Sequence, residues 1–375
     1  MSEIEIPAWD DHVKYDSIEN TSNSRRVDMM KRENLVDLCE WVVCEKIHGL
    51  NFSFITDGTT VQCARRMAIL DENESFFGYQ IIKAKYHDNI IKLWEVMNSK
   101  NLIRGVKIIV YGELFGGLYR HPEVKPVKGV SVIQHGIEYC PNHEFMAFDV
   151  FDGANLVGFN TMTEVLEDAG IPFLKPLARG SFEQVYNYDP NFVTTIPGLL
   201  GLPPLPKDNG AEGVIIRPVL HLCTSNGTRV IFKIKTANFV EKTKSGKKNY
   251  LLEQREVQKK PIKLMNIINA ELVLYINKNR LISVISKEGP LKKAKIAETA
   301  LLLYEDALED FQKEDDWSEK YNELKPEQKD ILKARGIAAS TKVIKGYLNE
   351  LKEFDKSNTL EDDDELSSDF HLLIE

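Results

Sequence analysis

The sequence has few cysteines, no long apolar run and no excess of positive charge. Its five cysteines are scattered, odd in number and form no Cys-x-x-Cys pair, so we expect neither a disulfide framework nor a zinc site. No apolar stretch approaches the roughly 18 to 20 residues that span a bilayer, and no membrane helix is predicted. The acidic N-terminus MSEIEIPAWDD has the pattern of neither a signal peptide nor an Arg-rich transit peptide. We therefore expect a cytosolic location.

The net charge is −9, from 48 Lys and Arg against 57 Asp and Glu. This balance argues against nonspecific binding of nucleic acid over the whole surface. The charge is unevenly distributed, however: residues 232–260 hold nine basic residues and three glutamates, whereas residues 356–375 hold seven acidic residues and one lysine. A polyanion would bind at the basic segment, although a solvated face and a disordered tail would have the same composition.

Glycine and proline are scarce in the last part of the chain, since nineteen of 22 glycines and twelve of 15 prolines lie in residues 1–250. Short β-branched or aromatic runs alternate there with turn clusters, which predicts mixed and largely antiparallel strands. These runs include 107–114, 144–151, 212–219 and 229–235. An apolar stripe predicts a helix at about 79–100. A second helix is predicted from Thr161, where Glu164 completes a capping-box spacing, to a stop before Gly170.

The pattern after residue 250 is helical, as in residues 262–279 and 340–354. A chain of 375 residues, 43% of them hydrophobic, is long enough for two globular domains. We predict an α+β domain at residues 1–250, an all-helical domain at 251–355 and an acidic, disordered tail at 356–375.

A lysine stands where two apolar runs meet. Residues 41–54 read WVVCEKIHGLNFSF, in which a run typical of a buried strand opens into EKIHG, with Lys46 at its centre, before a second alternating run begins. A charged ammonium at such a junction is costly to desolvate unless partner groups receive it. The tetrapeptide KIHG alone is weak evidence of function, so the rest of the chain has to decide.

Downstream runs also place charged residues within or at the ends of strands: Glu113 in YGELFG, Asp149 in AFDVF, Glu212 in EGVIIRP, and Lys233 and Lys235 in IFKIK. Each alone is more often structural. Lys233 and Lys235 are two apart, so on a strand they project from one face, and such a pair suits a phosphate. Glu113 and Glu212 could hold a hard divalent cation together with substrate phosphates.

The order and spacing of KIHG, YGELFG, FDV, EGVIIRP and KIK resemble the nucleotidyltransferase motifs shared by ATP-dependent ligases and messenger-RNA capping enzymes. The histidine of KIHG and the Asn-Phe after it resemble more closely the RNA ligase 2 family, which includes phage RNA ligases and kinetoplastid RNA-editing ligases. KYDSIEN, CARRM, FFGYQII, RGSFEQV and NRLISVISKEG agree. The resemblance, from about Lys14 to Leu351, implies an ATP-grasp-like α+β nucleotidyltransferase with mixed, largely antiparallel sheets, followed by an all-helical domain.

The resemblance implies that Lys46 attacks the α-phosphate of ATP and becomes lysyl-AMP. Glu113 and Glu212 are then the acids that hold Mg²⁺ or Mn²⁺, with Glu113 also near the ribose, and Lys233 and Lys235 bind the phosphates. A protonated amine cannot attack phosphorus, so the site must favour the neutral amine through burial, the neighbouring lysines and the metal ion. The lysine at the strand junction is thus expected to be the nucleophile.

The remaining family positions concern the nucleotide and the RNA end. Glu45 and Asn51 match positions that contact the nucleotide, and Arg66 matches one that contacts phosphate or the RNA end. Phe148 is expected to stack on the adenine, with Val214 as the apolar floor on its other side.

His48 matches a position that varies between aspartate and histidine, so only a positioning role is expected for it. The sequence departs from the family at three places. Leu50 and Met67 stand where relatives often have threonine, and Arg217 where lysine is common, which retains the charge.

We therefore predict an ATP-dependent RNA ligase that acts in RNA repair or editing. It is expected to be a monomer and to seal the 5′-phosphate and 3′-OH RNA ends of nicked duplexes. A DNA or general polynucleotide ligase, or a GTP-using capping enzyme, would normally carry an OB-fold and thus five short strands after residue 250; the helical pattern argues against both. A non-catalytic nucleotide- or RNA-binding module would form no covalent adduct. A pyridoxal enzyme would need a phosphate-binding glycine loop or helix near Lys46, and none is evident.

Overall fold

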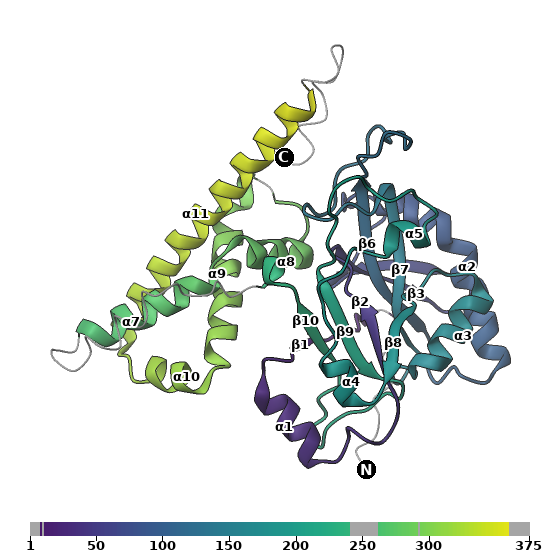
Figure 1. The fold of residues 1–375 in the computed structure, drawn as a ribbon, viewed down its shortest axis with the longest axis horizontal. Coiled ribbons are helices and arrows are strands. Elements are labelled where there is room, and N and C mark those ends of the chain that lie inside the picture. The colour runs from purple at the N-terminus through teal and green to yellow at the C-terminus, as the bar shows by residue number, and fades with distance from the viewer. Residues whose placement is uncertain (1–7, 10, 241–261, 292, 360–375) are drawn as a thin grey trace. The chain divides into compact units, whose positions relative to one another are not determined.

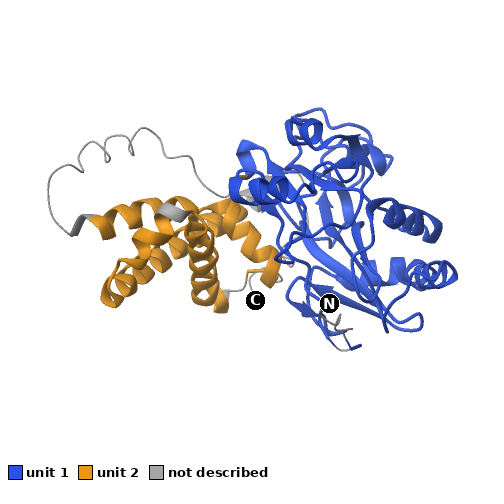
Figure 2. Cartoon of the chain, turned by 90° about the horizontal axis from the view of Figure 1, so that it is seen from below, with its two compact units in different colours: residues 1–239 blue, residues 240–375 orange. Residues whose placement is uncertain are grey.

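The computed structural model describes residues 8–9, 11–240, 262–291 and 293–359. The chain divides into two compact units, residues 1–239 (unit 1) and residues 240–375 (unit 2), which Figure 2 shows in different colours. The domain boundary predicted after residue 250 falls outside the described residues. So does the basic segment beyond residue 240, together with residues 360–375 of the predicted acidic tail.

Unit 1 contains two five-stranded sheets (Figure 1). The first sheet has the order β1 (Glu19–Asn20), β10 (Phe232–Lys235), β9 (Gly213–Pro218), β2 (Trp41–Glu45) and β8 (Pro176–Gly180). The second has the order β5 (Ala68–Ile69), β4 (Val61–Arg65), β3 (Leu50–Thr56), β6 (Ile108–Leu118) and β7 (Cys140–Phe151). Only β1 and β10 pair in parallel among these strands. The predicted mixed, largely antiparallel architecture is confirmed.

The helices of unit 1 are α1 (Ser24–Arg32), α2 (Tyr79–Ser99), α3 (Phe159–Ala169), α4 (Phe182–Tyr186) and α5 (Ile196–Leu199), with a 3-10 turn η1 (Ala237–Phe239). Helix α2 matches its predicted range. Together with α3 it packs against the second sheet (Figure 1).

The predicted start of α3 is wrong by two residues. The helix begins at Phe159, after Gly158, which offers no side-chain cap, rather than at Thr161. Phe159 and Met162 are buried in the core, so packing extends the helix beyond the capping-box signal. The predicted end is confirmed, because Gly170 adopts φ 74°, a left-handed conformation that glycine allows at a helix end.

Side chains along the strands of the first sheet alternate between two apolar clusters. Val42 and Cys44 of β2 belong to the main core cluster, which also contains the inner faces of α2, α3, β3, β6 and β7. Trp41 and Val43, on the opposite face of β2, belong to a second cluster with α1, α4, β9 and β10. This alternation decides which side chains face the candidate site.

The described part of unit 2 is helical, as predicted. Its elements are α7 (Ile262–Leu272), η2 (Val273–Tyr275), α8 (Lys278–Glu288), η3 (Lys293–Lys295), α9 (Ile296–Gln312), α10 (Asp315–Asn322) and α11 (Pro326–Thr359). No strand, and hence no OB-fold, occurs among the described residues after 240. Within the described part of the chain, none of the helices has the length and apolar character needed to cross a membrane.

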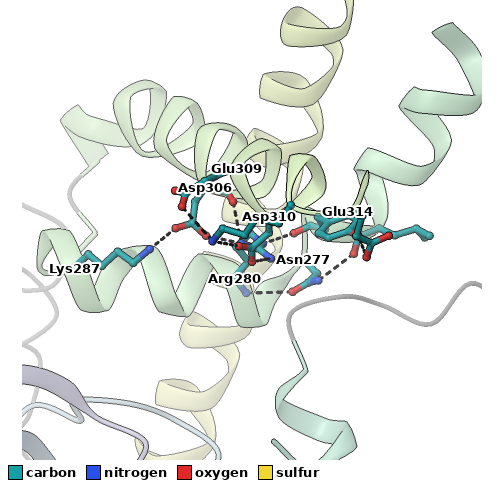
Figure 3. A network of polar contacts seen from close by, with 10 residues as sticks. Asn277, Arg280, Lys287, Asp306, Glu309, Asp310 and Glu314 are labelled. Carbon is teal, nitrogen blue, oxygen red and sulfur yellow. Dashed lines mark hydrogen bonds and ion pairs between the residues drawn. The ribbon is translucent and has the colours of Figure 1, made fainter. Parts of the chain in front are cut away.

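A polar network joins α8 to α9 in unit 2 (Figure 3). Arg280, in the first turn of α8, is 2% exposed, and its guanidinium donates to Asp306 Oδ2 at 2.6 Å and Asp310 Oδ2 at 2.7 Å. Its Nε donates to the Tyr275 carbonyl at 2.8 Å. A buried guanidinium with this many acceptors is satisfied and fixes α8 against α9.

Candidate active site

The loop between β2 and β3 carries Lys46, and hydrogen bonds from its backbone N–H groups to neighbouring residues hold it in place. The Lys46 N–H donates to Gly213 O of β9 at 2.9 Å, and the Gly49 N–H donates to Glu113 Oε1 of β6 at 3.1 Å. A Cβ atom at Gly49 would lie 2.3 Å from Leu114 O. This close approach explains why the motif KIHG ends in glycine.

Glu212, which directly precedes β9, lies at the centre of the candidate site. Its Oε2 is 2.8 Å from Lys46 Nζ and 3.4 Å from His48 Nδ1, and its Oε1 is 3.0 Å from Lys235 Nζ. The side chain is 3% exposed. Burial alone would raise the pKa of this carboxyl, but the ammonium groups of Lys235 and Lys46 hold it well below its ordinary value. Glu212 is therefore an anion that orients both lysines.

Glu113 is the second buried carboxyl of the site. It lies on β6 opposite Asn51 of β3, which places the two side chains on one face. Burial raises the pKa of Glu113 to about 7; the nearby Glu212 adds to this shift and the charge of Lys46 opposes it. Two carboxyls of this kind, close enough to influence each other, fit a hard divalent cation. The described residues contain no cluster of three metal-ligating side chains, so phosphate and water oxygens would complete the coordination.

Lys233 and Lys235 project from one face of β10, as predicted. The intervening Ile234 and the preceding Phe232 pack in the second apolar cluster on the opposite face. Lys235 is bound to Glu212, and Lys233 lies opposite Ile215 of β9. The two ammonium groups therefore line the same side of the first sheet as Glu212.

Phe148 occupies a β-bulge. The register of β6 and β7 shifts at Tyr111–Gly112, which leaves Phe148 as the extra residue of β7. It is only partly buried, and its carbonyl accepts a hydrogen bond from Arg217 Nη1 at 3.0 Å. β-Bulges often redirect a side chain next to a functional site. The residue at this bulge is Phe148, whose ring is predicted to stack on adenine.

Val214 does not lie where the sequence predicts. It is fully buried in the second apolar cluster, beside Trp41 and Phe182. Its neighbour Ile215 is partly exposed and shares a strand face with Arg217, the residue that contacts Phe148. The apolar residue of β9 on the Phe148 side is therefore Ile215, because consecutive side chains of a strand point to opposite faces.

Glu45 is bound to two threonines that the sequence analysis did not identify. It is 1% exposed and accepts from the Thr195 N–H at 2.8 Å, from the Thr195 hydroxyl at 2.7 Å and from the Thr194 hydroxyl. Burial raises the pKa of the Glu45 carboxyl, although these hydrogen bonds oppose the shift. Arg66, directly after β4, is half-buried, and its positive charge acts to lower the pKa of Glu113.

Asp149 has a structural role that the sequence analysis left unassigned. It is fully buried and accepts from Tyr15 Oη at 2.6 Å, Arg217 Nη1 at 2.8 Å and Arg229 Nη2 at 3.0 Å. Burial alone would raise the pKa of Asp149, but the two guanidinium groups hold it below its ordinary value. This cluster fixes the bulge of Phe148. The sequence analysis noted Arg217 only as a departure from the family that retains the charge, and did not connect it with Asp149.

Two family models match the chain and divide it much as the structure does. The model for RNA ligase matches residues 39–235, and the model for the T4 RNA ligase 2 C-terminal region matches residues 262–337. The chain belongs to the RNA ligase 2 family. This RNA ligase is 31% identical over 332 residues to RNA-editing ligase 1, mitochondrial, of Trypanosoma brucei brucei, covering 74% of this chain and 71% of that protein. RNA-editing ligase 2 of the same organism is 30% identical over 349 residues, covering 80% of this chain and 83% of the relative.

Solved structures of a Naegleria gruberi RNA ligase are similar in part. An apo mutant is 14% identical, with a TM-score of 0.41, and a mutant with ATP and Mn is 13% identical, with a TM-score of 0.41. Each covers 62% of this chain, which spans 58% and 57% of the Naegleria chains. The assignment of the family rests on the two family models and the trypanosome relatives.

Proposed function

We propose that this RNA ligase joins RNA ends through a covalent lysyl-AMP intermediate. Lys46 Nζ attacks the α-phosphate of ATP, a P–N bond forms and pyrophosphate leaves. An oxygen of the RNA 5′-phosphate then attacks the adenylate, which releases Lys46 and gives an RNA-adenylate. Finally the 3′-OH attacks the activated phosphate and AMP leaves. The observation that supports this proposal is the position of Lys46 Nζ, 2.8 Å from the buried Glu212 that Lys235 also binds.

The side chains around Lys46 have distinct tasks in this scheme. Glu212 orients the attacking amine and, with its depressed pKa, is a poor acceptor for the amine's proton. Lys233 and Lys235 neutralise charge that develops on the transferred phosphate and the leaving pyrophosphate. Glu113 and Glu212 would hold a divalent cation, which supplies further neutralisation of the phosphates when bound.

The nucleotide base is proposed to lie between Phe148 and Ile215. The substrate is proposed to be RNA with 5′-phosphate and 3′-OH ends, mainly as a nicked duplex, with unit 2 contributing to the retention of the ends. The monomeric state and the cytosolic location stay predictions.

Incubation with α-labelled ATP and Mg²⁺, followed by denaturing electrophoresis, tests the proposal. The wild-type chain should retain covalent label. Lys46→Arg should retain none while its circular dichroism is unchanged, because a guanidinium keeps the charge but is not a nucleophile. The matched control is Lys92→Arg, which alters an exposed lysine of α2 and should label like the wild type. Comparable labelling of Lys46→Arg would remove Lys46 from the role of nucleophile.

A further inference from the structure

The middle of the Lys46 loop is held by a tyrosine that lies in none of the nucleotidyltransferase motifs. The His48 N–H donates to Tyr139 Oη at 2.9 Å. Tyr139 is 2% exposed and directly precedes β7. Its ring packs against that of Phe115 on β6, with centroids 5.2 Å apart. Packing therefore fixes the Tyr139 side chain, and with it the position of the hydroxyl that accepts from the loop.

Tyr139 completes a set of three backbone anchors. The N–H groups of Lys46 and Gly49 are bound by β9 and β6, and the His48 N–H between them is bound by the Tyr139 hydroxyl. The two strand anchors fix the ends of the loop, but the peptide of His48 lies between them. Without this acceptor, the buried His48 N–H would need another hydrogen-bond partner, or the peptide would have to rotate.

The side chains on both sides of this peptide converge on one carboxylate. Lys46 Nζ and His48 Nδ1 lie 2.8 Å and 3.4 Å from the same oxygen, Glu212 Oε2. The direction of both side chains depends on the orientation of the peptides between them. The hydrogen bond to Tyr139 selects that orientation.

We propose that Tyr139 is a positioning residue for the nucleophile, and that its hydroxyl sets the direction of Lys46 Nζ through the His48 peptide. The proposal rests on the proposed role of Lys46 in forming lysyl-AMP. Displacement of a reacting group by about 1 Å can cost roughly a hundredfold in rate. Tyr139→Phe keeps the ring and its packing and removes only the oxygen. We therefore expect lysyl-AMP formation to slow about 10- to 100-fold, with little change in the ATP concentration that gives half-maximal rate.

Tyr86→Phe is the matched control. Tyr86 is a buried tyrosine of the same apolar cluster, 6% exposed, and its hydroxyl binds Glu144 Oε1 at 2.5 Å rather than the Lys46 loop. Both variants thus lose one buried, hydrogen-bonded hydroxyl. If Tyr139 acts by position, Tyr86→Phe should form lysyl-AMP at nearly the wild-type rate even where its melting temperature falls as far as that of Tyr139→Phe.

The experiment is a single-turnover measurement of label transfer from α-labelled ATP to the full chain, over a range of ATP concentrations, with thermal unfolding of each variant measured in parallel. A slower maximal rate in Tyr139→Phe alone supports the proposal. A wild-type rate, an equal loss in both variants, or failure of Tyr139→Phe to fold at the assay temperature would overturn it and leave lysyl-AMP formation intact. A wild-type chain that takes up no label would overturn the proposed function, and the role of Tyr139 with it.

Discussion

At the scale of single residues, the two neighbours Val214 and Ile215 have opposite surroundings. Val214 is fully buried among Trp41, Phe182 and the rest of the second cluster, whereas Ile215 lies on the face that carries Arg217 and the lysines of β10. Both are β-branched and both follow Glu212 within the motif EGVI. One residue therefore supports the fold, and the other lies on the face where the nucleotide is proposed to bind.

This contrast gives a paired prediction. Ile215→Ala should raise the ATP concentration that gives half-maximal adenylylation by about tenfold, since removing its methyl and methylene groups from contact with a base costs on the order of 1 to 2 kcal/mol. Val214→Ala should instead lower the free energy of unfolding by roughly 2 kcal/mol through the cavity it leaves. Its ATP dependence should stay near that of the wild type.

Labelling kinetics over a range of ATP concentrations, together with chemical denaturation of both variants, distinguishes the two roles. The reverse pattern, with ATP dependence altered only in Val214→Ala, would restore Val214 as the base contact and remove Ile215 from the site.

At the scale of elements, the N-terminal segment is bound to the second sheet by a buried lysine. Lys107, directly before β6, has no exposed surface, and its ammonium donates to the carbonyls of Ala8 at 2.5 Å, Trp9 at 3.2 Å and Asp11 at 2.5 Å. Tyr111 Oη donates to Val13 O at 2.8 Å. The same segment leads to Tyr15 in the Asp149 cluster and to β1, which pairs with β10. It thus links elements of both sheets.

Lys107→Met should lower the free energy of unfolding by roughly 2 to 3 kcal/mol, because hydrogen bonds to a charged donor are lost and buried carbonyls are left unsatisfied. The N-terminal segment should also become more sensitive to limited proteolysis. Lys92→Met, at an exposed position of α2, is the control and should change the unfolding free energy by less than about 0.5 kcal/mol. Unfolding of Lys107→Met at the wild-type denaturant midpoint would contradict the role of this anchor.

At the scale of the whole molecule, the residues proposed to react with ATP all lie in unit 1, between Glu45 and Lys235. Unit 1 has its own apolar clusters, and unit 2 has a separate one that includes residues of α7, α8, α9 and α11. Units with separate cores are expected to fold independently. The chemistry of ATP and the joining of RNA ends can therefore be separated by truncation.

A chain that ends at residue 250 should still form lysyl-AMP but lose most of its sealing of 5′-phosphate and 3′-OH ends, by roughly a hundredfold, because the ends are no longer held in line. Sealing by the full chain should require a 2′-OH near the 3′ end, the group that distinguishes RNA from DNA. Both reactions are measured in parallel on nicked duplexes with RNA or DNA on the 3′-OH side. Full sealing by the truncated chain would make unit 2 dispensable, and equal sealing of all-DNA nicks would indicate a general polynucleotide ligase.

Features that depend on local backbone geometry could be read from the sequence alone. Lys233 and Lys235 share a face because a strand repeats every two residues, and the helix over α2 follows from apolar residues at helical spacing. The order of the motifs KIHG, YGELFG, FDV, EGVIIRP and KIK indicated the family, which the family models confirm, and made Lys46 the predicted nucleophile. The first two inferences need only neighbours in the chain, and the third needs only the order of the motifs along it.

Features that depend on partners far along the chain were decided only by the tertiary structure. The two-residue repeat of a strand makes Val214 and Ile215 face opposite ways, but the packing of Trp41 and Phe182 on one side of the sheet determines which of them is buried. Glu45 is satisfied by threonines about 150 residues later, and the His48 peptide by a tyrosine 91 residues later. The physical reason is that a strand's repeat is set by its own backbone, whereas the direction of each face and the partners of buried polar groups are set by what packs against it.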